Sequence, residues 1–537
     1  MFANFPRYTR FIARRERVIS LGWIIGLVAF IAAITAAYPN LFASYDALKA
    51  MVQTVNSPGM VAMMGPVFGF PDNLNTPMVM AQQCLLWVAL AAAVMNIFFV
   101  IRHTRTDEEL GRHEMLASLP VGRLTGSLAT LCSAFVLNLL ISVISAALVI
   151  LVLGHVTIQG SVPGSVAAGA FAYCLSIGAQ GFAFAGITLL VAQLFSTSSG
   201  TMGVSVALLI VFYMIRAVGD MQGSALTYLS PLGLGLRVQA FYTNAFWPII
   251  VLVAEGLVIG GIALMINAKR DVGMGVFAAR KGRVHAKRGM CSPLGFSWRL
   301  LRNAMIAWAA ALLLLGAAYG SVAGQSSVYS EGNGMMAQMI NNMGGYESLV
   351  VTIMGLLISV PLIVAMNKLR SEERRGRIEQ VLSKAVSRGS AFLSYLCIAV
   401  LASLLFPFLL VIGFYAVGAS SAPAGTLDLA ALLKASYAYL PAQLCMIGLS
   451  AFLVGCFPKL TSLSWVMFAY SFLVVYFGGM FQVPEAMKKI SPFGNVPQLL
   501  IQGQELKALP LVILCVIAAA LMAAGLIGYR RRDILGT

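Results

Sequence analysis

Long apolar runs that do not alternate with polar residues follow one another from end to end of this chain. At about 20 residues per membrane crossing, they predict twelve spanning helices. These are expected at roughly 18–38, 78–101, 126–154, 165–196, 199–218 and 246–267, and then at 303–323, 347–367, 389–418, 429–457, 460–481 and 508–529. Continuous runs are typical of helices and not of barrel strands, whose residues alternate. We therefore expect an all-α integral membrane protein.

Composition supports this class and excludes several others. The chain is 59% hydrophobic, which is far above the share found in soluble globular proteins. The eight cysteines are spaced singly, without a Cys-x-x-Cys or Cys/His cluster, so neither a disulfide framework nor a metal site is expected. The predicted spans carry no paired carboxylates, His cluster or nucleophile–base pair, and we expect no catalytic residues.

A short charged cassette occurs twice, each time after a long apolar run. Aligned on Gly111 and Gly376, both copies read acid-Glu-x-x-Gly-Arg-x-Glu. The defining residues are Asp107, Glu108, Gly111, Arg112 and Glu114 in the first copy, and Glu372, Glu373, Gly376, Arg377 and Glu379 in the second. Charged residues make up only 10% of the chain, so two matching clusters indicate an internal duplication.

Further echoes keep the same order in both halves. Ser-Pro-Leu-Gly at 230–233 returns as Ser-Pro-Phe-Gly at 491–494, and Arg-Asp-Val at 270–272 returns as Arg-Asp-Ile at 532–534. An even number of spans per half gives parallel repeats about an axis along the membrane normal. We expect a first six-span half at 1–273, a basic linker at 274–297 and a second six-span half at 298–537.

The positions of the basic residues predict the orientation. If the N-terminus is cytoplasmic, 29 of the 36 Lys and Arg residues fall on the cytoplasmic side, as the positive-inside rule requires. Both cassettes and both termini are then cytoplasmic, which suits a bacterial cytoplasmic membrane. The same rule explains the net charge of +17, so no nucleic-acid partner is expected.

Two interpretations fit the cassettes. The segment 373–386 is mildly amphipathic, with Ile378, Val381, Leu382 and Ala385 at helical spacing, and could lie among lipid headgroups. Alternatively, each copy forms a short helix that docks a soluble partner. Lipid binding alone would favour lysines over carboxylates, so the second interpretation is preferred. Two equivalent copies then require a partner with two equivalent grooves.

These residues resemble a known family. Glu-x-x-Gly-Arg-x-Glu, followed by Pro-Val-Gly-Arg at 120–123 or Ala-Val-Ser-Arg at 385–388, is similar to the coupling-helix signature of type-2 ABC exporter permeases. The duplicated twelve-span layout, with Arg-Asp closing each half, resembles the exporters of polyketide antibiotics, the tetronasin-exporter group. The resemblance covers nearly the whole chain. The second copy lacks the proline found at 120, which allows unequal coupling between the halves.

The resemblance implies a cytoplasmic coupling helix and an external re-entrant segment in each half, the latter at roughly 219–245 and 482–507. It also implies that two copies of a separate ABC ATPase subunit hydrolyse ATP. The chain has no G-x-x-x-x-G-K-[ST] element, so ATP and Mg are expected on the partners, with no cofactor here. The expected cargo is a hydrophobic or amphipathic small molecule, antibiotic- or drug-like, or a lipid.

The main alternative is a secondary drug transporter of the major-facilitator type, driven by an ion gradient. That class also has two six-span repeats and a Gly-Asp-Arg-Gly-Arg type motif after its second span. The leading Gly is missing here, the cassette is rich in Glu, and the segments 219–245 and 482–507 are long for that fold. A membrane-embedded enzyme ranks far behind.

Individual charges complete the expectations. Glu255 lies in an otherwise charge-free stretch from Val238 to Ala268, where it is either protonated, paired with Arg216, or used to recognise a cationic substrate. Arg112 and Arg377 are expected to pair with a partner or with Glu108 and Glu373, four residues earlier. Charge reversal at Glu108 and Glu373 is expected to weaken ATPase binding and to leave span packing intact.

Overall fold

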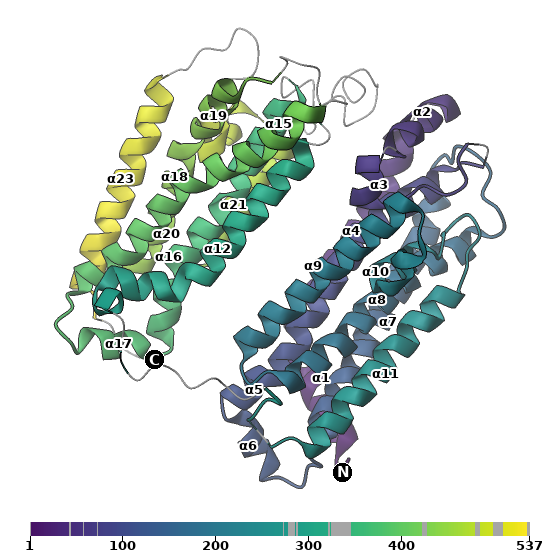
Figure 1. The fold of residues 1–537 in the computed structure, drawn as a ribbon, viewed down its shortest axis with the longest axis horizontal. Helices are drawn as coiled ribbons and strands as arrows, with labels where there is room; N and C mark the ends of the chain where they lie inside the picture. The colour runs from purple at the N-terminus through teal and green to yellow at the C-terminus, as the bar shows by residue number, and fades with distance from the viewer. Residues whose placement is uncertain are drawn as a thin grey trace. The chain divides into compact units, whose positions relative to one another are not determined.

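The structure is a computed structural model in which every regular element of the described residues is helical. It describes residues 2–41, 44–56, 58–71, 73–271, 273–277, 285, 288–320, 323, 345–421, 427–477, 484–497 and 508–533. The chain divides into two compact units, Met1–Gly282 and Arg283–Thr537, which we describe separately (Figure 1).

The first unit is a bundle of long helices with short helices at both ends. The long helices are α1 (Phe5–Ala37), α4 (Thr76–His103), α7 (Thr125–Leu153), α8 (Val166–Leu194), α9 (Ser198–Gln222) and α11 (Trp247–Lys269). At one end lie η1 (Tyr38–Leu41), α2 (Tyr45–Val55) and α3 (Pro58–Met64), and at the other, beside the N-terminus, lie α5 (Arg105–Glu109) and α6 (Arg112–Ala117) (Figure 1). Helix α8 packs against α4, α7 and α11 and is the most buried of the long helices.

Small and amide side chains let these helices approach closely. A Cβ on Gly186 of α8 would lie 2.6 Å from the carbonyl oxygen of Gly256 on α11. Asn96 of α4 and Asn138 of α7 exchange two side-chain hydrogen bonds, of 3.1 and 2.8 Å, in the buried interior. Small-residue contacts and interhelical hydrogen bonds are the forces that hold helices together in a bilayer, where the lipid tails are as apolar as the side chains.

We expect Gly186→Ala to destabilise the first unit, because its methyl group would overlap a main-chain oxygen that cannot rotate away. Overpacking of this kind costs about 1–3 kcal/mol, which lowers the melting temperature by roughly 5 °C. Gly261→Ala on α11 is the matched control, since a Cβ there meets nothing within 4 Å. Thermal unfolding in detergent should separate the two variants, and equal melting temperatures would contradict the close approach of α8 and α11.

The second unit is a bundle of the same kind. Its elements are η3 (Arg288–Cys291), α12 (Pro293–Gly320), α15 (Tyr346–Leu357), α16 (Ser359–Arg374), α17 (Arg377–Leu382), α18 (Arg388–Ser421), α19 (Leu429–Tyr437), α20 (Leu440–Cys456), α21 (Leu463–Phe477), α22 (Glu485–Ile490), η5 (Pro492–Asn495) and α23 (Ala508–Arg531). Helix α12 packs on α18, and α20 packs on α23. Helix α17 lies at one end of the unit, and α15 and α19 lie at the other (Figure 1).

The prediction of an all-helical, multi-pass membrane protein is confirmed. Eleven helical segments in the described part of the chain are long and apolar enough to cross a membrane. The twelfth expected span, at 460–481, corresponds to α21, which has 15 residues up to Phe477; residues 478–481 lie outside the described part. Twelve spans therefore remain a prediction.

The segment expected to be re-entrant in the first half contains η2 (Ala225–Leu229) and α10 (Pro231–Leu236). All six residues of α10 are buried. The carbonyl of Gly235 accepts a 3.0 Å hydrogen bond from the hydroxyl of Ser176, which lies well inside α8. The chain between α9 and α11 thus folds into the bundle. In the corresponding segment of the second half, 482–507, the structure describes residues 484–497, which contain α22 and η5, and residues 482–483 and 498–507 lie outside the described part.

Candidate docking elements and the ion pairs behind them

Each cassette forms a turn on glycine followed by a six-residue helix. Gly111 has a φ of 68° and precedes α6, and Gly376 has a φ of 66° and precedes α17. Such left-handed backbone favours glycine, because a Cβ is strained there. A Cβ at either position would meet nothing within 4 Å inside its unit, so backbone conformation is the reason for glycine that the structure shows.

The first carboxylate of each copy, Asp107 or Glu372, pairs with the first residue of the short helix and with a second basic residue of the same unit. Asp107 accepts two hydrogen bonds from Arg15 of α1, at 2.6 and 2.9 Å, and one from Arg112, at 3.2 Å. Glu372 lies 3.0 Å from Lys368 and 3.6 Å from Arg377. In each copy, the arginine that follows the glycine therefore pairs with the carboxylate five residues before it.

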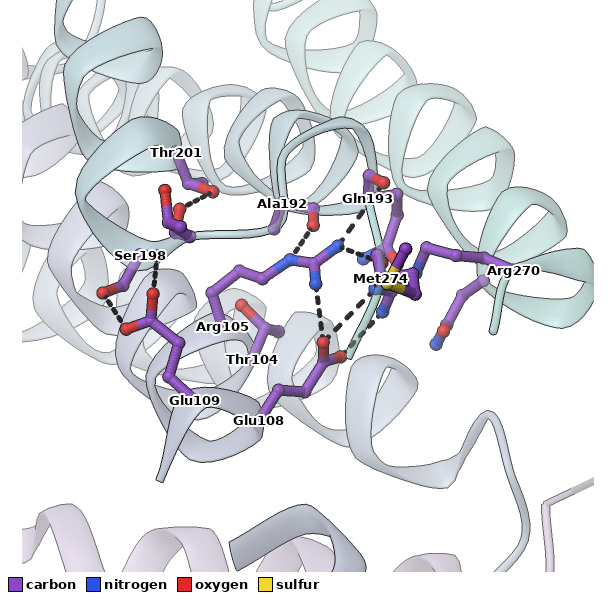
Figure 2. A network of polar contacts seen from close by, with 12 residues as sticks. Thr104, Arg105, Glu108, Glu109, Ala192, Gln193, Ser198, Thr201, Arg270 and Met274 are labelled. Carbon is purple, nitrogen blue, oxygen red and sulfur yellow. Dashed lines mark hydrogen bonds and ion pairs between the residues drawn. The ribbon is translucent and has the colours of Figure 1, made fainter. Parts of the chain in front are cut away.

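This differs from the expected pairing with Glu108 and Glu373. In the first unit, Glu108 accepts 2.7 Å hydrogen bonds from both Arg105 and Arg270 (Figure 2). Arg270 closes the last helix of the unit, α11. The carboxylate is therefore already engaged between the short helix and the end of the last span.

Arg105 anchors this network in the interior. Its side chain is 1% exposed and donates to the main-chain carbonyls of Ala192, Gln193 and Met274, at 3.4 Å for Gln193 and 3.2 Å for Met274 (Figure 2). A buried guanidinium is stable only when its donors are satisfied, and these carbonyls do so together with Glu108. The α5 segment is thereby tied to the end of α8 and to the loop after α11.

The second unit repeats the arrangement with the residues at equivalent positions. Glu373 accepts hydrogen bonds from Arg370, at 2.9 Å, and from Arg532, at 2.5 Å. Arg370 also donates to the carbonyl of Pro458, at 3.1 Å. Arg532 follows the last helix, α23, just as Arg270 follows α11. Both halves therefore use one carboxylate to join the end of the second predicted span to the end of the sixth.

A second pair of arginines completes the match. Arg123, in the turn after α6, donates to the carbonyl of Arg270, and Arg388, after α17, donates to the carbonyl of Arg532 at 2.8 Å. Sequence reasoning aligned Arg123 with Arg388 but missed Arg105 and Arg370 as members of the site. Their spacing of 265 residues, equal to that between Gly111 and Gly376, was the available signal.

The exposed residues are the ones that a partner could reach. The side chains of Arg112 and Arg377 are 50% and 55% exposed, and Glu114 and Glu379 are exposed as well. In contrast, the side chains of Asp107, Glu108, Glu372 and Glu373 are between 2% and 11% exposed. Four of the predicted docking carboxylates therefore face the interior of their own unit.

The two short helices also present different surfaces. Leu110, Met115 and Leu119 around α6 are 57%, 74% and 54% exposed, although they are large and apolar. Around α17 the exposed residues are mainly polar, including Arg374, Arg375, Gln380 and Lys384, while Ile378 is 3% exposed. An apolar surface of this kind is typical of an interaction site.

Further contacts fix the α6 region in the first unit. Glu109 accepts hydrogen bonds from the main-chain nitrogen of Ser198, at 2.8 Å, and from its hydroxyl, at 2.5 Å (Figure 2). Ser198 begins α9, and a carboxylate is favourable at a helix N-terminus. Near the start of the chain, the side chain of Asn4 donates to the carbonyl of Pro120 at 2.6 Å. The turn on each side of α6 is therefore held by other elements.

The structure does not bring Glu255 and Arg216 together. Arg216 is fully buried on α9, where it donates to the carbonyl of Ala62 at 2.7 Å and lies 3.5 Å from Asp220. Its role is to hold α3 against the end of the bundle. Glu255 is half-buried on α11 and has no hydrogen bond or ion pair to any residue that the structure describes. An unpaired acid in an apolar span is a candidate functional position.

Comparison with known proteins gives two similarities. Residues 290–530 match the family described as the C-terminal domain of the multidrug efflux system permease Rv1217c. The chain is also 29% identical over 539 aligned residues to the multidrug efflux system permease protein Rv1217c of Mycobacterium tuberculosis, covering 98% of this chain and 94% of that protein. The similarity thus extends across both units. Together these matches show that the chain is similar to a multidrug efflux permease along nearly its whole length.

Proposed function

We propose that the chain is the transmembrane permease subunit of an ATP-driven ABC exporter of the kind that resembles the polyketide-antibiotic exporters. Two copies of a separate ATPase subunit would dock on α6 and α17. The observation that carries this proposal is the duplicated ion-pair arrangement, in which a short helix in each half is joined through a buried Glu to the end of that half's last span. Two identical docking devices suit two identical partners.

The arrangement offers a path for force. A partner that pushes on α6 would move α5, and Glu108 would pull Arg270 and the end of α11 with it. A buried, hydrogen-bonded ion pair resists separation, because breaking it leaves an uncompensated charge in a low-dielectric site. Glu373 and Arg532 would act in the same way between α17 and α23. These carboxylates are thus positioning residues behind the docking surface.

Docking itself would fall to the exposed residues. Glu114 and Glu379 face outward, and in the first half Leu110, Met115 and Leu119 surround them with apolar surface. Charged pairs at such a contact give specificity, and buried apolar side chains supply most of the affinity. Since the chain has no G-x-x-x-x-G-K-[ST] element, ATP and Mg would bind on the partner subunits.

The substrates would be hydrophobic or amphipathic drug-like molecules. The printed name of the Mycobacterium tuberculosis relative, a multidrug efflux system permease protein, supports this class, as does the scarcity of polar groups along the long helices. In the proposed orientation, α6 and α17 face the cytoplasm and the substrates leave the cell across a bacterial cytoplasmic membrane. The agreement with the positive-inside rule supports that orientation.

Inverted membrane vesicles test the energy source. With the ATPase subunits co-expressed, uptake of a fluorescent amphipathic dye should require ATP and persist when a protonophore collapses the ion gradient. Vesicles that hold this chain without the ATPase should take up no dye. Uptake driven by an imposed proton gradient in the absence of ATP would overturn the proposal and establish the alternative, a secondary drug transporter.

Glu255 is proposed to recognise cationic groups on substrates, because it is unpaired within the described part of a span. We expect Glu255→Gln to lower ATP-driven uptake of a cationic dye about fivefold, the effect of losing ~1 kcal/mol of interaction, without lowering the yield of folded protein. Glu255→Asp keeps the charge and should restore part of the activity. Unchanged uptake by the Gln variant would make Glu255 a structural residue.

A further inference from the structure

A cavity of about 510 Å³ lies in the second unit, at the end opposite α17. It is formed by α20, α21, α22, η5 and α23, and apolar side chains such as Met446, Leu449 and Met467 form most of its wall. The lining residues of α23 run from Leu509 to Leu521, a length of about 18 Å at the helical rise of 1.5 Å per residue. The cavity is therefore elongated along the last helix.

One charged residue lines this cavity. Lys489, in the last turn of α22, is exposed and forms no ion pair with any residue that the structure describes. Its main chain is held in place, because the side chain of Asn495 donates to the carbonyl of Lys489 at 2.8 Å and to that of Ser491 at 2.9 Å. The main chain that carries this lysine is thus fixed beside an apolar cavity.

The fold does not require a lysine at this corner. When Ser230 is aligned with Ser491, Lys489 corresponds to Tyr228 of the first unit, whose ring lies 6.3 Å from that of Trp247. The first half therefore uses an aromatic contact where the second half has a cation. In the predicted orientation this end of the second unit faces the outer side of the membrane, where basic residues are scarce. Lys489 is therefore an exception to the general distribution of charge.

We propose that this cavity binds one single-tailed anionic amphiphile, with its apolar tail along α23 and its anionic group beside Lys489. The volume lies within the range of about 300–1,000 Å³ that suits one drug-sized molecule. Met446 and Met467 adapt readily to tails of different shape. Because a tail gains little by leaving an equally apolar bilayer, selectivity must come from the charge on Lys489.

This inference goes beyond the proposed function. It requires neither an ATPase partner nor transport, and it concerns a different unit and a ligand of opposite charge from those proposed for Glu255. A binding measurement on the purified chain therefore tests it separately from the energy source.

Photolabelling with a diazirine derivative of dodecanoate, compared with the methyl ester of the same probe, measures the selectivity. At pH 8 and equal concentrations, the carboxylate should label peptides containing 446–449 and 509–521 about fivefold more than the ester, the effect of ~1 kcal/mol. Lys489→Gln should bring this ratio close to one. The matched control is Lys434→Gln, which removes an exposed lysine from α19 at the same end but outside the cavity, and should leave the ratio unchanged.

A second variant tests the cavity itself. Met467 is half-buried, so Met467→Trp should fold, fill part of the space and lower labelling by both probes. Equal labelling by carboxylate and ester in the wild-type chain, or a ratio that survives Lys489→Gln, would overturn the proposal. Displacement of the dodecanoate probe by equimolar phosphatidylglycerol would also overturn it, since the site would then hold a resident two-chain lipid.

Discussion

Replacing Glu108 or Glu373 by lysine will strongly destabilise the corresponding unit. Each carboxylate lies between two arginines, with side-chain exposures of 11% and 2%, so the new lysine would join a cluster made only of cations. Removing one partner from a buried ion pair costs about 3–5 kcal/mol, and the like charge adds to that cost. Gel filtration of detergent-purified protein should show the monodisperse peak falling at least about fivefold in either variant.

Glu114→Lys and Glu379→Lys are the matched controls, because they reverse the same charge at exposed positions of α6 and α17. Both should purify with wild-type yield. Glu108→Gln should give an intermediate yield, since it keeps two hydrogen-bonding atoms but loses the charge. If Glu108→Lys purifies normally but no longer binds the ATPase, Glu108 contacts the partner directly, as the sequence suggests, and does not hold the unit together.

The sequence predicted the long helices better than it predicted the contacts of individual carboxylates. Apolar runs predicted the long helices well, because a helix that crosses lipid must satisfy its backbone internally whatever its neighbours are. Helix α1 extends beyond the first predicted span, because it starts at Phe5 whereas the apolar run starts near residue 18. Five arginines lie between residues 5 and 17, among them Arg15, which binds Asp107, so hydropathy alone could not find this part of the helix.

The positions of the two charged cassettes were predicted correctly, but the partners of their carboxylates were not. The repeated spacing located both cassettes, but the direction of each carboxylate depends on partners far along the chain, such as Arg270 for Glu108, 162 residues away. The pairing of Arg216 with Glu255 failed for a related reason. Arg216 lies 3.5 Å from Asp220, four residues later, and also reaches main-chain carbonyls of α3, which leave no trace in the pattern of charged side chains.

The exposed acids should control partner binding one copy at a time. We expect Glu114→Lys to remove one ATPase subunit, Glu379→Lys to remove the other, and the double variant to bind neither. Reversing a charge at a desolvated contact costs about 2–5 kcal/mol, which lowers affinity at least about 30-fold. Native mass spectrometry of the purified complex should show one permease chain with two ATPases for wild type, with one for each single variant, and with none for the double variant.

Asp271→Lys is the control for this series, because Asp271 is an exposed acid that follows α11 and belongs to neither short helix. It should keep both ATPase subunits. If Glu114→Lys lost less binding than Glu379→Lys, the exposed apolar residues Leu110, Met115 and Leu119 would account for the difference, since they add affinity that charge reversal leaves in place.

Two outcomes would contradict the docking model. A wild-type complex built on two copies of this chain would remove the need for duplicated helices, and undiminished binding in the double variant would mean that α6 and α17 rest on lipid headgroups.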